Sequence, residues 1–183
     1  LLSQLALPDE QLQRLAQFMA RENDQRLYRG LLGERCWGMD IFNATSSTER
    51  LRDLLGDNVP GSVAIFMYQA AGAWEQDFIY YLDFFGACLA AAQEPFPKRI
   101  ATVHAMERTR GSIPSTHLVS ALIMPNLGNV FIRDATIFAH YCCARVAVAV
   151  ERYRVATGKL PEKLEDIIPL YLPALVEDPF DGK

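Results

Sequence analysis

Two pairs of side chains in this chain have the chemistry and the spacing to bind a metal from a helix. His104 and Glu107 lie three residues apart, as do His140 and Cys143. Side chains at this spacing share a helix face, so two helices could each supply two ligands. Carboxylate-bridged helical bundles also require inward-facing glutamates, which the segment around His140 lacks. We therefore predict no metal site and no cofactor, and interpret the histidines as ordinary core or surface residues.

A second candidate for chemistry is Ser115-Thr116-His117, in which a hydroxyl lies next to a possible base. Adjacent residues seldom hold the hydrogen-bond geometry of a nucleophile and its base, so this segment is interpreted as the cap of a helix that begins near His117. The sequence has no glycine-rich phosphate-binding loop, no HExxH and no Gly-x-Ser-x-Gly. No catalytic residue is predicted, and whether the chain is an enzyme is left open.

The most informative polar pattern is a stripe near the C-terminal third of the chain. At 100° per residue, its members fall within about 20° of one line along a helix. The stripe consists of Asp134, Tyr141, Arg145 and Arg152. It is either the solvated, salt-bridged face of a mostly buried helix, which we favour, or the polar wall of a pocket. On the second interpretation Asp134, Tyr141 and Arg145 are the candidate ligand-binding residues.

A long helix must position this stripe. The helical pattern opens at Pro125 and continues without a breaker to Thr157, and Gly158 then provides a typical C-terminal cap. Because Arg145 is the only charge between Asp134 and Glu151, the helix is apolar nearly all round. We therefore predict that residues 125–157 form the central helix of the fold.

A second long helix is predicted over residues 74–92, where apolar side chains recur in steps of four and three. This aromatic seam consists of Trp74, Phe78, Tyr81, Phe85, Cys88 and Ala92. Such a stripe can line a ligand groove, but it is more typical of a core. Other helices are predicted near 8–19, 24–41, 51–55, 62–71 and 98–108, and Pro161 should open a short one.

Composition favours a single globular domain of the mainly α class. The chain has 183 residues, half of them hydrophobic, and a net charge of −4 that argues against nucleic-acid binding. The uncharged stretches 58–74 and 111–132 hold too many breakers and polar groups to span a bilayer. Lys98, Arg99, Arg108 and Arg110 form a basic cluster that should be solvated.

The chain has four cysteines, Cys36, Cys88, Cys142 and Cys143. They lack the spacing of a zinc site, and their redox state is left open. Cys142 and Cys143 are expected to be buried.

The C-terminal part of the chain resembles a known segment. It carries, in order, Tyr153, Gly158, Leu160-Pro161, Leu164, Pro169, Tyr171-Leu172-Pro173, Asp178-Pro179 and Gly182. This run is similar to the segment after the long N-terminal helix of type II secretion major pseudopilins. It resembles more closely the ending of uncharacterised envelope proteins of planctomycete-type bacteria, to which Gly33-Glu34-Arg35 is also similar. Tyr153, Gly158, Pro161, Tyr171, Asp178 and Pro179 are the structural residues of this motif.

The resemblance implies an extracytoplasmic envelope protein, anchored in the membrane by a segment that this chain does not contain. The calcium ligands of pseudopilins lie beyond the Asp-Pro turn. The resemblance therefore implies no metal site in this chain. We expect a helical domain over 1–157 with a pseudopilin-like appendage, 158–183, packed on it. The leading functional hypothesis is a non-enzymatic scaffold or interaction domain that associates with itself or with an envelope protein. The alternative is a helical ligand-binding domain or hydrolase, with a pocket near the aromatic seam and the polar stripe.

Overall fold

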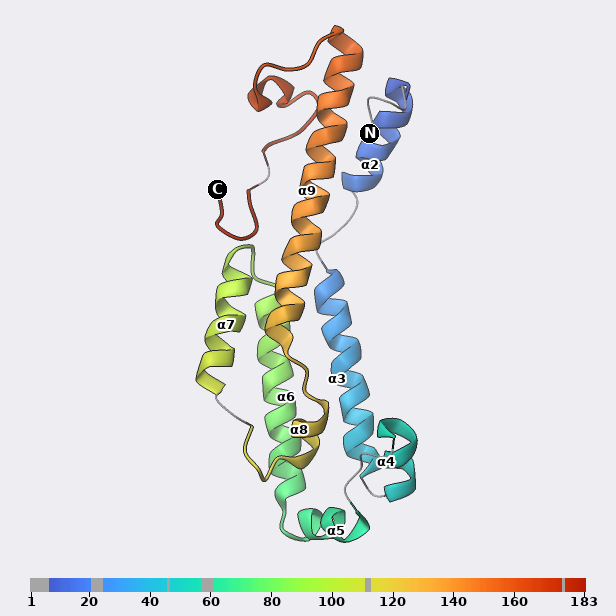
Figure 1. Ribbon diagram of the computed structural model, residues 1–183, viewed down its shortest axis with the longest axis vertical. Helices are drawn as coiled ribbons and strands as arrows, with labels where there is room; N and C mark the ends of the chain where they lie inside the picture. Colours follow the sequence, from blue (N-terminus) through green and yellow to red (C-terminus); the bar gives the residue numbers. More distant parts are fainter. Residues whose placement is uncertain (1–6, 21–24, 46, 57–60, 111–112, 176) are drawn as a thin grey trace. The chain divides into compact units, whose positions relative to one another are not determined.

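The computed structural model describes residues 7–20, 25–45, 47–56, 61–110, 113–175 and 177–183 (Figure 1). Helices account for 73% of the protein, and these ranges contain no β-strand. The prediction of a mainly α, multihelical fold is therefore confirmed. The chain forms two compact units, unit 1 with Leu1–Asp24 and Ile132–Lys183, and unit 2 with Gln25–Phe131. The predicted boundary between 157 and 158 stays a prediction.

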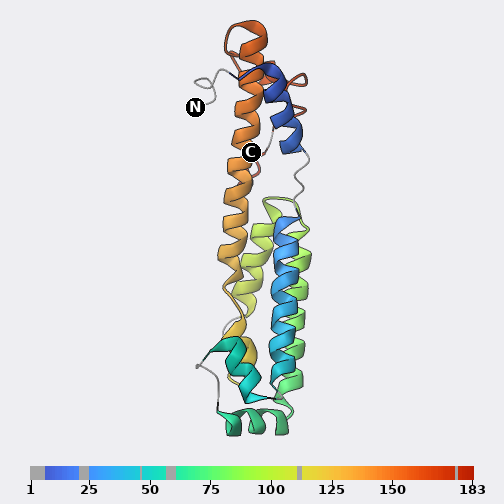
Figure 2. The same ribbon diagram turned by 90° about the vertical axis from the view of Figure 1, so that its right-hand side faces the viewer.

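Unit 2 is built around helix α6 (Ala73–Ala92), which packs against α3, α5, α7 and α8. Figures 1 and 2 both show α3 running alongside α6. The other helices of the unit are α3 (Arg26–Ala44), α4 (Thr48–Leu55), α5 (Ser62–Ala70), α7 (Lys98–Arg110) and α8 (Leu118–Ile123). The predicted helices are thus present, although the predicted start of α3 at Asp24 lies outside the described residues.

The aromatic seam of α6 forms the core of unit 2, as predicted. Tyr81, Phe85 and Cys88 are buried, and Phe78 packs against them from a partly buried position. Phe42 of α3 meets this seam, with its ring centroid 5.0 Å from that of Phe78 and 5.4 Å from that of Tyr81. Tilted aromatic contacts at these distances stabilise a core beyond the area that they bury. The seam is therefore packed core, not the wall of a groove.

Helices α3 and α6 come unusually close at Gly38. The Tyr81 hydroxyl donates a hydrogen bond to the carbonyl oxygen of Glu34, at 2.8 Å. This bond places the tyrosine ring where a Cβ on Gly38 would overlap it. Only glycine therefore fits at position 38, and the hydrogen bond fixes the register of the two helices.

A buried carboxylate caps the start of helix α8, and nothing in the sequence near that helix indicates it. Asp77 of α6 is fully buried and accepts hydrogen bonds from the Tyr68 hydroxyl at 2.7 Å and from the Val119 amide at 2.8 Å. The Ser120 amide also donates to it, at 3.3 Å. The prediction that Ser115-Thr116-His117 caps this helix is wrong, because His117 precedes α8 without a side-chain capping bond. The cap comes from a helix about forty residues earlier in the sequence.

The basic cluster contains one exception to its predicted solvation. Arg99 is 2% exposed, whereas Lys98 and Arg108 are exposed. Its Nε donates to the carbonyl oxygen of Glu94 at 2.9 Å, and its guanidinium lies 4.2 Å from the centre of the Phe96 ring. A planar guanidinium can be buried in this way because the aromatic ring and the carbonyl oxygen replace the water molecules that would otherwise solvate it.

Unit 1 combines α2 (Asp9–Ala20), most of α9 (Leu127–Thr157) and the C-terminal segment with its short 3-10 helix, Leu164–Ile167. Helix α9 ends as predicted, since Gly158 has a φ of 76° and its amide donates to the Arg154 carbonyl. Pro161, however, does not open a helix. The Asp166 carboxylate accepts from the amides of Glu162 and Lys163, which folds the chain into a turn before the 3-10 helix.

No described helix has the length and hydrophobicity needed to cross a membrane. The first residues of the two uncharged stretches, 58–60 and 111–112, lie outside the described residues.

Candidate functional site

The C-terminal segment is held on α9 by a small apolar cluster. Ile167 and Leu172 are buried against Ala149 of α9, and Tyr153 and Tyr171 pack around them. The rings of Tyr153 and Tyr171 meet edge to face, with centroids 5.9 Å apart. Tyr171 and Leu172 therefore attach the C-terminal segment to α9, whereas Leu175 is exposed.

The Asp-Pro part of the motif forms a closed turn. The Asp178 carboxylate accepts from the Phe180 amide at 2.7 Å, and its backbone amide donates to the carbonyl of Lys183 at 2.8 Å. Pro179 is buried, and Gly182 has a φ of 75°. This is the Asx geometry that aspartate commonly forms in turns. Asp178, Pro179 and Gly182 therefore form a turn within unit 1.

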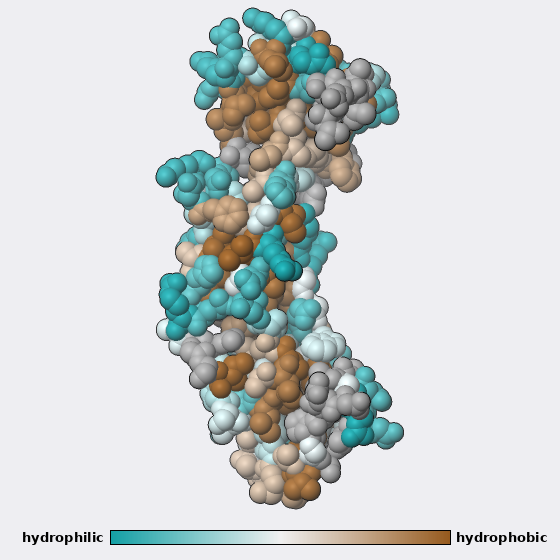
Figure 3. All heavy atoms as spheres, in the orientation of Figure 1, coloured by the Kyte–Doolittle hydropathy of each residue, from teal (hydrophilic) through white to brown (hydrophobic). Residues whose placement is uncertain are grey.

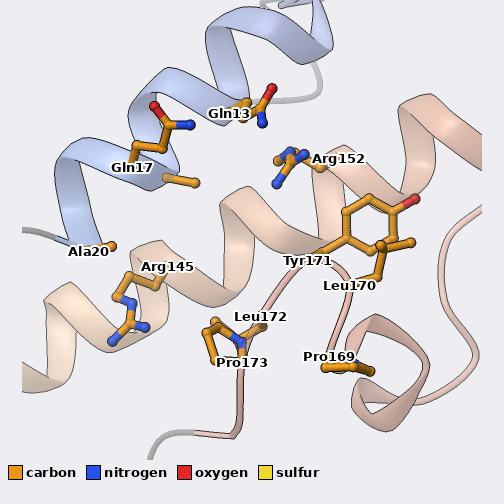
Figure 4. Close-up of a pocket in the computed structure, with 11 residues that line it drawn as sticks. Gln13, Gln17, Ala20, Arg145, Arg152, Pro169, Leu170, Tyr171, Leu172 and Pro173 are labelled. Carbon is orange, nitrogen blue, oxygen red and sulfur yellow. The ribbon is translucent and has the colours of Figure 1, made fainter.

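A cavity of about 250 Å³ opens within unit 1 (Figure 4). Helix α2 forms one wall with Gln13, Ala16, Gln17 and Ala20, and the segment 169–173 forms another. Helix α9 contributes Arg145 and Arg152, two members of the predicted polar stripe. These side chains come from three parts of the chain that are distant in sequence, so the cavity depends on the tertiary fold.

Only two of the four residues of the polar stripe, Arg145 and Arg152, line this cavity. All four residues of the stripe are half-buried. Arg145 lines the cavity, whereas Asp134 and Tyr141 are not among its lining residues and take part in contacts of their own. Nor do Trp74, Phe78 or the rest of the aromatic seam line it, since they belong to the core of unit 2.

The two arginines have different electrostatic surroundings. The Arg152 Nε donates to Asp9 of α2 at 2.9 Å, and its guanidinium lies 5.4 Å from the centre of the Tyr171 ring. Figure 4 shows Arg152 reaching from α9 toward α2, with Tyr171 beside it. Arg145 has neither an ion pair nor a hydrogen bond to any described side chain or carbonyl. Asp9 thus partly neutralises the charge of Arg152, whereas no residue that the structure describes neutralises that of Arg145.

The potential metal-binding pairs stay separate. His104 Nδ1 lies 3.9 Å from Glu107 Oε2, but the Glu107 carboxylate also accepts from the Gly128 amide at 2.8 Å and so caps the start of α9. His140 and Cys143 are both exposed. Across the described ranges, no group of three or more His, Cys, Asp or Glu side chains gathers into a possible metal site.

The four cysteines form no disulfide with any described residue, and they lie in two environments. Cys88 and Cys142 are buried, whereas Cys36 and Cys143 are exposed. The prediction that Cys142 and Cys143 are both buried is therefore wrong for Cys143, because neighbouring positions on α9 face different sides. Burial raises the pKa of the Cys142 thiol, although nearby Arg145 acts in the opposite direction.

The chain was compared with protein-family models, with curated proteins and with solved structures. No family model matches the chain, and neither a curated protein nor a solved structure is similar enough to count as a match. What the site does must therefore be argued from its own residues.

Proposed function

We propose that this chain is a non-enzymatic interaction domain of an extracytoplasmic, membrane-anchored envelope protein. In this proposal it associates with a second copy or with another envelope protein. The location draws on the resemblance of the C-terminal motif to envelope proteins. The interaction role draws on one feature of unit 2, an exposed apolar face on helix α5.

The α5 face consists of Val63, Phe66 and Met67, which are 75%, 66% and 61% exposed. Their spacing of three and four residues places them on one side of the helix. Ile65 and Tyr68 are buried and attach the opposite side to unit 2. No residue of Ser62–Ala70 carries a charge. Figure 3 shows apolar surface over α5.

Large apolar side chains that gather on one face, without charges among them, are typical of interaction surfaces. Covering the three side chains of the α5 face would contribute about 3–6 kcal/mol from apolar burial alone. Much of this gain would offset the entropy that two partners lose on association. The α5 face alone thus suits a weak contact, which repeated copies or a membrane anchor would strengthen.

Photo-crosslinking in cells that make the protein tests this proposal. A crosslinking amino acid at position 66 should give a discrete product in the membrane fraction, formed with a second copy or with one envelope protein. The same group at Asp83, an exposed position on α6, is the control and should give none. The proposal is refuted if the full-length protein is free and monomeric in the cytoplasm, or if both positions crosslink equally.

A second candidate, a ligand-binding domain, is supported by the cavity of unit 1. The carrying observation is Arg145, a half-buried cation that lines the cavity without a counter-charge among the described residues. A titration followed by ¹H–¹⁵N NMR tests this candidate with two probes, benzoate and its neutral analogue benzamide. Shifts at lining residues with either probe support it, and their absence with both probes refutes it.

A further inference from the structure

The chemistry of the cavity lining selects one kind of ligand. Its described polar side-chain groups are two guanidinium groups, the carboxamides of Gln13 and Gln17 and the Tyr171 hydroxyl, and no aspartate or glutamate is among them. Guanidinium groups only donate hydrogen bonds, and carboxamides can donate as well. Such a lining favours a ligand that accepts hydrogen bonds and carries negative charge.

The number of available cations limits that charge. Arg152 is already paired with Asp9, so Arg145 is the one cation of the described lining without an acidic partner. A guanidinium and a carboxylate are matched in plane and charge, and they form two parallel hydrogen bonds. A phosphate dianion would require further cations or several backbone amides. One free arginine therefore fits a single carboxylate.

The opposite end of the cavity is suited to an apolar group. Arg145 and Arg152 are seven residues apart, which is about 10 Å along the axis of α9. Near Arg152, the lining includes the Tyr171 ring, the Leu170 side chain and the Gln13 carboxamide. Figure 4 shows Tyr171 and Leu170 at the Arg152 end, away from Arg145. The cavity thus has Arg145 at one end and, at the other, an aromatic and an aliphatic side chain beside an arginine already paired with Asp9.

We infer that this cavity binds a small monocarboxylate with an apolar or aromatic body, whose carboxylate pairs with Arg145 and whose body lies against Tyr171. The inference rests on the ligand-binding candidate of the proposed function. The volume of about 250 Å³ lies below the usual range for drug-sized ligands, which starts near 300 Å³. The ligand is therefore smaller than a typical drug.

The test is an NMR titration of the whole chain with benzoate, benzamide and inorganic phosphate. Benzoate should shift the Arg145 side-chain Nε–H signal together with the amide of Tyr171. Benzamide and phosphate should bind at least about tenfold more weakly, because a charge-assisted bidentate contact is lost or mismatched.

Two matched variants locate the contact. Arg145→Gln should weaken benzoate about ten- to hundredfold and leave benzamide unchanged. Arg133→Gln removes an exposed arginine of the same helix that does not line the cavity, so it should leave benzoate binding unchanged. A thermal melt of each variant verifies that unit 1 remains folded.

The possible contrary results are distinct. Equal binding of benzamide and benzoate would overturn the carboxylate inference while the ligand-binding candidate survives. Tighter binding of phosphate than of benzoate would overturn the ligand class. No shift with any probe would refute both the inference and the candidate. If Arg145→Gln lowered the melting temperature without changing benzoate binding, Arg145 would stabilise unit 1 without binding the carboxylate, and the inference would be overturned.

Discussion

Replacing Ile167 by alanine is the sharpest test of how the C-terminal segment is attached to α9. Ile167 is fully buried in the 3-10 helix and packs with Leu172 against Ala149. Its carbonyl oxygen also accepts hydrogen bonds from the amides of Tyr171 and Leu172, at 2.9 and 3.1 Å. The side chain therefore anchors the same short stretch whose backbone amides report on its opening.

The expected cost follows from the atoms removed. Isoleucine to alanine deletes three buried carbons, worth about 2.4 kcal/mol at 0.8 kcal/mol each. The cavity that remains adds to this loss, because the surrounding side chains of a packed cluster relax only partly into the space. We therefore expect a loss of about 3–4 kcal/mol in the stability of the docked segment. The control Leu164→Ala, at a side chain 44% exposed in the same 3-10 helix, should cost about 1 kcal/mol.

Native-state hydrogen exchange measures the difference directly. The Tyr171 and Leu172 amides should exchange about a hundred- to a thousandfold faster in Ile167→Ala, since 1.4 kcal/mol corresponds to a factor of ten. In Leu164→Ala the same amides should accelerate by less than about tenfold. Equal acceleration in the two variants would refute the reasoning, because it would mean that burial at position 167 does not hold the segment.

Three further predictions concern unit 2. Gly38→Ala should destabilise it by about 1–3 kcal/mol in urea melts, because the new methyl group overlaps the Tyr81 ring, whereas Gly33→Ala faces open space and should be neutral or stabilising. Asp77→Asn should cost about 2 kcal/mol or more, since an amide cannot accept from the Tyr68 hydroxyl and the α8 amides as a carboxylate does; a melt unchanged by this substitution would contradict the capping role. Burial is the main reason why the pKa values of Tyr68 and Tyr81 are raised, so the folded chain keeps protons that the unfolded chain releases from about pH 10 upward. The free energy of unfolding should therefore fall as the pH rises past about 10, and the tyrosinate absorbance of Tyr68 and Tyr81 should appear only on unfolding.

Local patterns in the sequence were sufficient to predict most helices. The aromatic seam has helical periodicity over Trp74 to Ala92, and the structure has α6 at Ala73–Ala92. Serine is a typical residue before a helix, and the Ser47 hydroxyl accepts from the Arg50 amide at the first turn of α4. Gly158 ends α9 with the positive φ that its type allows. In each case the deciding interaction lies within a few residues, so a single-sequence pattern contains it.

The errors occurred where the local structure depends on a side-chain contact that no spacing rule predicts, whether the partner is distant in sequence or only a few residues away. Asp77 caps α8 from another helix, and nothing near His117 indicates this. Arg99 is buried because the Phe96 ring and the Glu94 carbonyl replace its water, whereas the sequence shows only a cluster of basic residues. Pro161 was expected to open a helix on its propensity alone, but the Asp166 carboxylate bonds the preceding amides first.

The candidate site combines both situations. Of the stripe, Arg145 and Arg152 line the cavity, but its other walls come from α2 and from residues 169–173, whose positions no periodicity encodes. Segment 169–173 lines the cavity because Ile167 and Leu172 anchor it to Ala149. The attachment of the C-terminal segment and the ligand-binding hypothesis are therefore physically linked, because the anchor formed by Ile167 and Leu172 also holds Tyr171 beside Arg152. Loosening the anchor at Ile167 should weaken any ligand that contacts Tyr171, even though Ile167 does not line the cavity.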